Sequence, residues 1–405
     1  FVSALLVGQR TDDEGPSVWT SIEFPEGGVV FDVIETPTGY LAVGWGPHTD
    51  RGSDGVVWAS QDCLHWERLP TPVELAGRDR RGRADALPDP GPTEIEFAGG
   101  SYLAAGGDIG PEVVLWLSPG GRDWERIVPE VVPTDRPGRL FEMNDLIAVD
   151  DHFVGIGGWG GSEPMTPSFW ISNDGQSWRE VTEVEPPPTG LASRGGENPW
   201  GWAMFDIGSA LAASESELFA AGTSGRGEAV WRSTDGGSSW TRVLGDDQAT
   251  FRILGDIAIS PDGVIVAVGN GPFGGEPVVW WSPDGTTWSL LSDMESFAVP
   301  KGPAEYAGVT WLAPEVSLDS IAWAGGRFIV LGTEGGPSAA VPVVWTSTDG
   351  RTWSRELPGP AFGERLASGA STCGDYVLLY GGDFDTAVGW TRPIDSFAAV
   401  GPESG

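Results

Sequence analysis

The sequence has few basic residues, few cysteines and no long apolar run. Its 405 residues contain 23 Lys and Arg, of which only Lys301 is lysine, against 58 Asp and Glu, so the net charge is −35. A chain this acidic lacks the clustered basic side chains that contact phosphates, which argues against nucleic-acid and anionic-membrane partners. No stretch of 18 apolar residues is present, so we expect no membrane-spanning segment.

Cys63 and Cys373 are too few for a disulfide framework. From the blade order derived below, we expect one blade to lie between them and both to be free thiols, because a disulfide needs Cα atoms within about 7 Å. Phe1 is not an initiator Met, so we expect a mature or trimmed product, in which a removed signal or lipoprotein leader would not be visible.

A segment typified by VWRSTDGGSSWTRV at residues 230–243 recurs along the whole chain. Copies occur at 56–69, 114–127, 168–181, 278–291 and 343–357, and their second tryptophans are separated by 48 to 65 residues. This period is typical of a four-stranded propeller blade with loops of variable length. The fold class predicted is therefore all-β, with residues 1–405 forming one propeller of four-stranded antiparallel blades, which we expect to be a monomeric fold unit.

Each copy has the chemistry of a strand, a tight turn and a returning strand. The turn Gly supplies a positive φ, while the Ser hydroxyl and Asp carboxylate can accept bonds from turn N–H groups, so the Asp is expected to be structural. The large indoles can fill the seams between sheets, which explains 21 tryptophans beside five tyrosines.

Residues 233–240, STDGGSSW, match S-x-D-x-G-x-x-W in full, and the chain here resembles the Asp-box, or bacterial-neuraminidase-repeat, β-propellers. That sialidase-like class includes sialidases, xyloglucan-cleaving hydrolases, sortilin-type receptors and photosystem II assembly factors. The resemblance implies a secreted or cell-envelope protein whose site lies on the face opposite the Asp-boxes. It leaves open whether the protein is a hydrolase or a binding protein.

Blade number depends on the two ends. Third-strand tryptophans count eight units, namely Trp19, Trp58, Trp116, Trp170, Trp231, Trp280, Trp345 and Trp390. Residues 1–9 and 16–21 indicate strands of a first blade without an innermost strand, and residues 394–405 are expected to supply that strand. We therefore predict eight blades in a ring closed by N- and C-terminal strands, with seven the alternative because residues 363–393 lack an outer strand.

An acidic residue opens each expected innermost strand, in the series Asp32, Glu94, Asp145, Asp206, Asp256, Asp319 and Glu364. We expect these carboxylates to cap the turns that lead into the strands, because a group needed once for catalysis would not recur in every blade. A cation such as calcium in the channel is the alternative. No other metal or cofactor is expected.

Three long connections, 70–93, 182–204 and 292–317, are expected on the face opposite the Asp-boxes. Trp200, Trp202, Tyr306 and Trp311 are their large aromatics, and we predict that they bind a protein or glycan partner without catalysis. The alternative is a glycoside hydrolase on the same face. Its weak catalytic candidates are Asp206, Asp319, Glu305 and Tyr306, although neighbours in sequence such as the last two point to opposite sides of a strand.

Overall fold

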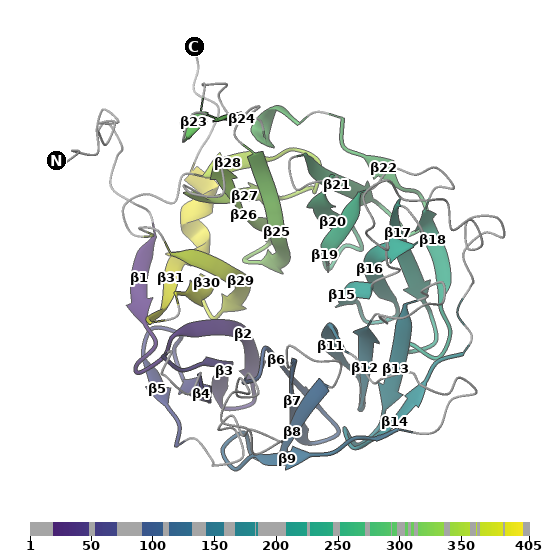
Figure 1. Cartoon of the computed structure of the whole chain (residues 1–405), viewed down its shortest axis with the longest axis vertical. Helices are drawn as coiled ribbons and strands as arrows, with labels where there is room; N and C mark the ends of the chain where they lie inside the picture. The colour runs from purple at the N-terminus through teal and green to yellow at the C-terminus, as the bar shows by residue number, and fades with distance from the viewer. Residues whose placement is uncertain are drawn as a thin grey trace.

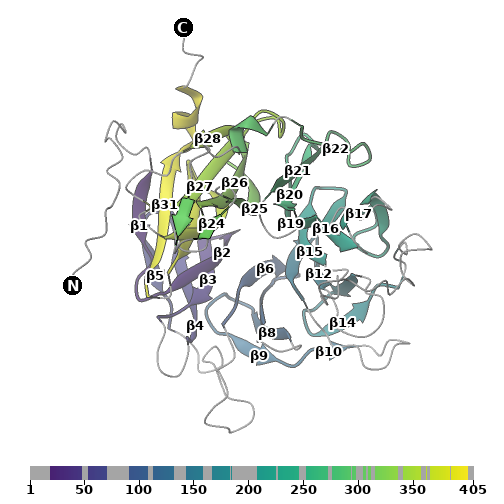
Figure 2. The same ribbon diagram turned by 45° about the horizontal axis from the view of Figure 1, so that its top comes forward.

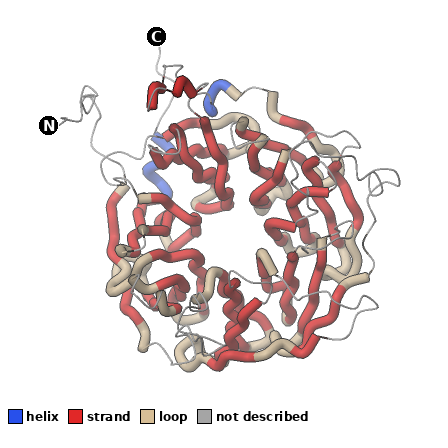
Figure 3. The backbone as a smooth tube through the Cα atoms, viewed as in Figure 1, coloured by secondary structure: helices blue, strands red, loops and turns tan. Residues whose placement is uncertain are grey.

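The computed structural model describes most of the chain between residues 19 and 399. The described residues are 19–47, 53–70, 91–107, 113–131, 143–157, 167–182, 184, 208–224, 227–245, 252–271, 276–292, 294–297, 304–306, 309–311, 315–335, 341–356, 362, 365–383 and 385–399. Strands dominate them, and the only helices within these ranges are two 3-10 segments, η2 (Glu295–Phe297) and η3 (Ile394–Ala399) (Figure 3). None of these helices is long and apolar enough to cross a membrane.

The strands form small antiparallel sheets arranged around a common axis, which is a β-propeller architecture (Figures 1 and 2). We number the blades along the chain. Blade 1 consists of β2 (Val29–Thr36), β3 (Gly39–Trp45), β4 (Gly55–Ser60) and β5 (Trp66–Arg68). Blade 2 consists of β6 (Glu94–Ala98), β7 (Ser101–Gly107), β8 (Val113–Ser118) and β9 (Glu125–Ile127). Blade 3 consists of β11 (Asp145–Val149), β12 (His152–Gly157), β13 (Ser168–Ser172) and β14 (Ser177–Glu180), with the short added strand β10 (Glu130–Val131). Blade 4 consists of β15 (Gly208–Ala213), β16 (Leu218–Ser224), β17 (Gly227–Ser233) and β18 (Thr241–Gly245). Blade 5 consists of β19 (Ile253–Ile259), β20 (Ile265–Asn270), β21 (Pro277–Ser282) and β22 (Ser289–Leu290). Blade 6 consists of β25 (Glu315–Ala324), β26 (Arg327–Gly335), β27 (Val341–Ser347) and β28 (Ser354–Glu356).

Blade 7 combines the two ends of the described chain. Its strands are β29 (Leu366–Cys373), β30 (Tyr376–Gly382), β31 (Ala387–Pro393) and, at the outer edge, β1 (Thr20–Glu23). One strand-ladder pair, Val29 with Gly382, connects the sheet of this blade to that of blade 1. The described strands therefore make seven four-stranded blades where the sequence analysis expected eight.

The count of eight was wrong because one blade was counted twice. Trp19 precedes an outer strand, while Trp390 lies in the third strand of the same blade, and both belong to one buried cluster. The outer strand missing after residue 363 is β1. Residues 394–399 form η3 instead of the expected innermost strand, so N- and C-terminal strands pair at the outer edge of the ring. The expected strand at 1–9 lies outside the described residues.

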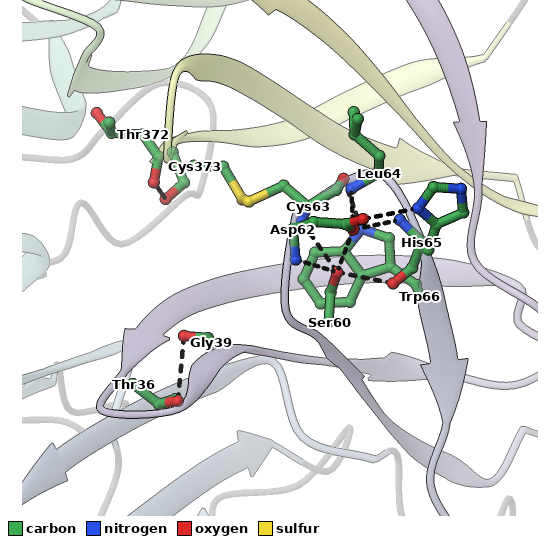
Figure 4. Close-up of a disulfide and its surroundings, with 11 residues drawn as sticks. Thr36, Gly39, Ser60, Asp62, Cys63, Leu64, His65, Trp66, Thr372 and Cys373 are labelled. Atoms are coloured by element: carbon green, nitrogen blue, oxygen red, sulfur yellow. Dashed lines mark hydrogen bonds and ion pairs between the residues drawn. A yellow bond between two sulfur atoms is a disulfide. The ribbon is translucent and has the colours of Figure 1, made fainter.

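The same miscount explains the wrong prediction of two free thiols. Cys63 lies in the β4–β5 turn of blade 1 and Cys373 ends β29 in blade 7, and these blades are neighbours. The two residues form a disulfide, with Cα atoms 5.8 Å apart (Figure 4).

The repeated turn between the third and fourth strands has the expected geometry. In the turn after β13, the Ser172 hydroxyl accepts the Gly175 N–H at 2.9 Å, and Asp174 Oδ1 accepts the N–H groups of Gln176 and Ser177. Gly175 has φ 72°, and the Trp178 indole N–H donates to its carbonyl at 2.9 Å. The Asp of this turn is structural, as predicted.

The turn tryptophans fill seams between neighbouring blades. Trp240 of blade 4 is 2% exposed and stacks on Phe169 of blade 3, with ring centroids 4.1 Å apart and planes 16° apart. Both rings belong to a cluster drawn from the facing sheets of these two blades. Indole packing between sheets therefore holds adjacent blades together.

Candidate functional site

Carboxylates on the innermost strands of blades 1, 3 and 5 connect each of these blades to the next one. Asp32 accepts the N–H of Val33 at 2.7 Å with one oxygen and that of Ile95, in blade 2, at 2.9 Å with the other. Asp145 bonds Leu211 of blade 4 at 2.6 Å in the same way. Asp256 repeats the arrangement toward blade 6. These groups do bind backbone N–H groups, but across the seam, and not as caps of their own entry turns.

The expected acidic ring is interrupted at Asp319, because several innermost strands share a one-residue β-bulge but carry their Asp at different positions relative to it. In β19 the pairing skips one residue, Gly255, and Asp256 resumes it; in β25 the skipped residue is Asp319, and Ser320 resumes it. Asp319 is therefore exposed, and its carboxylate accepts the Ser317 hydroxyl at 2.6 Å. It also lines a small cavity of about 200 Å³ between blades 6 and 7. Asp206 and Glu364 lie outside the described residues.

Burial raises the pKa of these axial carboxylates, which we define as Asp32, Glu94, Glu96, Asp145 and Asp256. The pKa of Asp145 rises to about 8 and those of Asp32 and Asp256 to about 6, despite the backbone N–H bonds that lower them. Burial and then the neighbouring negative charges raise the pKa of Glu94 and Glu96 well above the usual range.

Within the part of the chain that the structure describes, no group of three or more His, Cys, Asp or Glu side chains is arranged to hold a metal ion. The backbone N–H bonds across the seams already give the bridging aspartates a structural role.

The predicted long-loop residues are only partly described. Trp200 and Trp202 lie outside the described residues. Glu305 and Tyr306 belong to β23 (Ala304–Tyr306), which pairs with β24 (Val309–Trp311) as a separate two-stranded sheet. The backbone thus brings Tyr306 and Trp311 onto one hairpin, in which Ala304 is opposite Trp311 and Tyr306 is opposite Val309.

A groove of about 610 Å³ lies on the face of the repeated turns, opposite the long connections in which a site was predicted. It runs between the turns of blade 1 and the turn after β8 in blade 2. Tyr40, Trp66 and Tyr102 line it together with uncharged polar side chains such as Gln61 and Thr38. No pattern in the sequence marked this groove, because its walls come from repeated turns that were interpreted as purely structural.

The charged side chains of the groove are paired with each other. His65 Nδ1 lies 2.7 Å from an Asp62 carboxylate oxygen, and Arg122 of blade 2 lies 3.6 Å from Glu67 of blade 1. The side-chain hydrogen bond with His65 is the main reason that the pKa of Asp62 falls to about 2. The groove therefore presents the half-buried Tyr40 ring, small exposed parts of the buried Trp66 and Tyr102, amide and hydroxyl groups, and charged side chains that contact each other.

Gly120 leaves an open position in the groove wall. It occupies the place that Asp has in most of the other turns, and no described heavy atom lies within 4 Å of the Cβ that a side chain there would add. In the same turn, the buried Ser118 hydroxyl has no hydrogen-bond partner among the described residues.

Comparisons with known proteins support the fold and give one hint about function. No protein-family model matches the chain. A xyloglucanase from Paenibacillus sp. is 28% identical over 217 residues, which cover 51% of this chain and 20% of the xyloglucanase. The chain thus corresponds to about a fifth of that enzyme's length.

Two solved structures resemble the whole chain at low sequence identity. YCF48 bound to D1 peptide has a TM-score of 0.54 and 15% identity, covering 94% of this chain and 98% of that one. The RRP9 WD40 repeats have a TM-score of 0.50 and 10% identity, covering 93% and 97%. These similarities support a β-propeller fold for the chain.

Proposed function

We propose that this protein is a non-catalytic β-propeller of the cell envelope or extracellular space that binds a glycan in the groove between blades 1 and 2. The observation that carries the proposal is the lining of the groove, where Tyr40, Trp66 and Tyr102 lie beside Gln61 and Thr38. Aromatic side chains offer apolar faces and edges to sugar rings, while amides and hydroxyls can bond sugar hydroxyls.

The paired charges favour an uncharged ligand. Because Asp62 and Glu67 already face His65 and Arg122, an added charge on the ligand would have to compete with these pairs. A neutral oligosaccharide avoids that competition. The similarity to a xyloglucanase adds support for a glucan-type ligand.

The disulfide supports the proposed location outside the cytoplasm. Disulfides persist in oxidising compartments and are rare in the reducing cytosol. The Cys63–Cys373 bond therefore agrees with secretion or exposure at the envelope.

A binding experiment with a blocked groove tests the proposal. Gly120→Trp would place an indole in the open part of the groove without removing an existing side chain. We expect xyloglucan oligosaccharides to bind the native protein and the matched control Gly120→Ala, measured by glycan array and calorimetry, but to lose at least about tenfold in affinity for Gly120→Trp. Equal binding by all three proteins would show that the ligand binds elsewhere.

The long-loop face remains the second place to look for a partner. YCF48, a protein of similar fold, is bound to a peptide, so a peptide partner is a reasonable candidate for this face. If so, alanine at Trp200, Trp202, Tyr306 or Trp311 should weaken binding by about 2 kcal/mol or more for at least one of them. Stability should change by less than about 1 kcal/mol.

A glycoside hydrolase is the alternative function, favoured only by the xyloglucanase similarity. Its candidates are Asp206, Asp319, Glu305 and Tyr306, because hydrolysis commonly needs an acid and a second carboxylate or an activated nucleophile. Release of sugars from xyloglucan by the native protein, lost in Asp206→Asn or Asp319→Asn, would establish the enzyme and overturn the binding proposal.

A further inference from the structure

The ring of blades is closed without a covalent bond at its outer edge. β1 pairs with β31 over four residues, from Thr20 opposite Thr391 to Glu23 opposite Val388. Nearer the axis, blades 1 and 7 share the single strand pair Val29 and Gly382. Because residues 24–28 connect β1 directly to β2 of blade 1, the ring can open where β1 separates from β31, whereas consecutive blades elsewhere stay joined by the chain.

The disulfide joins the same two blades through their turns. Cys63 in the β4–β5 turn and Cys373 at the end of β29 are 0% exposed and share a buried cluster with Trp58, Trp66 and Tyr380 (Figure 4). The two cysteines are 310 residues apart in sequence. The bond thus encloses most of the propeller in one covalent loop.

Cys63 occupies a backbone position that favours glycine. Its φ is 65°, and the equivalent residue of the other repeated turns is a glycine with φ between 69° and 86°, namely Gly121, Gly175, Gly237, Gly285 and Gly350. A side chain in this left-handed region costs of order 1 kcal/mol. The cysteine is therefore present in spite of the local backbone cost, which indicates that its sulfur has a role.

We propose that the Cys63–Cys373 disulfide is a covalent clasp that closes the ring after β1 has docked. Docking brings the two turns together, and oxidation then forms the S–S bond. The two thiols lose two protons and two electrons to a disulfide-containing oxidant by thiol–disulfide exchange, and the oxidant leaves as a dithiol. Because the enclosed loop is long, the clasp restricts the unfolded chain strongly.

The test compares oxidised protein, reduced protein and the double variant Cys63→Gly/Cys373→Ser. Glycine at 63 is the residue found in the other turns, so the variant removes the disulfide and also relieves the strained φ. We expect no titratable thiol in the unfolded, unreduced native protein. Reduction should lower its unfolding temperature by at least about 5 °C, while the variant should melt near the reduced protein and not respond to reductant.

Two outcomes would overturn the clasp. One is two titratable thiols in native protein purified from an oxidising compartment. The other is an unfolding temperature that changes neither with reductant nor in the variant. Should the variant fail to fold, the reduction of the native protein still decides the question.

Discussion

At the scale of single residues, each repeated turn depends on a left-handed residue and a carboxylate that accepts two backbone N–H groups. In the turn after β8, Gly120 takes the place of the Asp, and the Ser118 hydroxyl is left without a described partner. Adding a carboxylate to this turn and removing one from another turn can therefore be compared as two opposite substitutions.

Gly120→Asp is expected to stabilise the protein by about 1 kcal/mol. The new carboxylate can accept the turn N–H groups and the Ser118 hydroxyl, and the unfolded chain loses the freedom of glycine. The reverse change, Asp174→Gly, removes such a carboxylate and should destabilise by a similar amount. Urea denaturation of both variants checks this, and a destabilised Gly120→Asp would contradict it.

Trp240→Ala should cost about 3–5 kcal/mol of unfolding free energy. Its indole is 2% exposed, stacks on Phe169 of the neighbouring blade and donates to the Gly237 carbonyl at 3.0 Å. Chemical denaturation measures the loss. A cost below about 1 kcal/mol would mean that the seam repacks around the missing ring.

The sequence could predict these turns because their chemistry is local. Glycine at a positive φ, a Ser hydroxyl and an Asp carboxylate are sufficient to specify them. It could not predict that Asp319 leaves the axial ring, because β19 and β25 share a one-residue bulge, and Asp319 occupies the bulged position whereas Asp256 follows it. Nor could it predict the groove, which is assembled from turns of two blades.

At the scale of elements, β1 is the part on which closure of the ring depends. The outer strand of blade 7, β1, comes from the opposite end of the chain from the other three strands of that blade. Counting tryptophans in sequence order therefore assigns β1 to an additional blade. Blade content was predictable from the repeat, whereas the pairing of the ends was not. The disulfide was missed for the same reason.

Deletion of residues 1–23 should lower the unfolding free energy by more than about 3 kcal/mol, because buried Trp19 and Ile22 are lost with the strand. Trp19 packs edge-on against Phe362 and Phe397, which the deletion would expose. Deleting only residues 400–405 serves as the control and should have little effect. Thermal unfolding that is equal for both deletions would refute closure by β1.

At the scale of the whole molecule, two sets of carboxylates respond to pH in opposite directions. The axial Asp32, Asp145 and Asp256 have raised pKa values in the folded state, so the stability linked to them is complete below about pH 4 and is lost as pH rises through about 6 to 8. The pKa of Asp62 in its turn is lowered to about 2, so its contribution is present above about pH 4 and lost as pH falls toward 2.

The unfolding temperature should therefore rise as pH falls from 8 to about 5 and decline below about 4. Asp145→Asn should flatten the change near pH 8, because the bridging aspartate with the highest pKa is replaced by a side chain that does not ionise. A melting temperature that falls steadily from pH 8 to pH 5 would show that the axial carboxylates ionise freely in the folded protein.

Binding in the groove without cleavage is the claim on which the functional account depends. The most direct measurement is NMR of xyloglucan oligosaccharides mixed with native protein, with Gly120→Trp as the blocked control. The account predicts ligand signals that broaden or shift with the native protein, remain unchanged with Gly120→Trp, and show no new reducing ends after prolonged incubation. Cleavage of the oligosaccharide by native protein, or undiminished binding to Gly120→Trp, would contradict it.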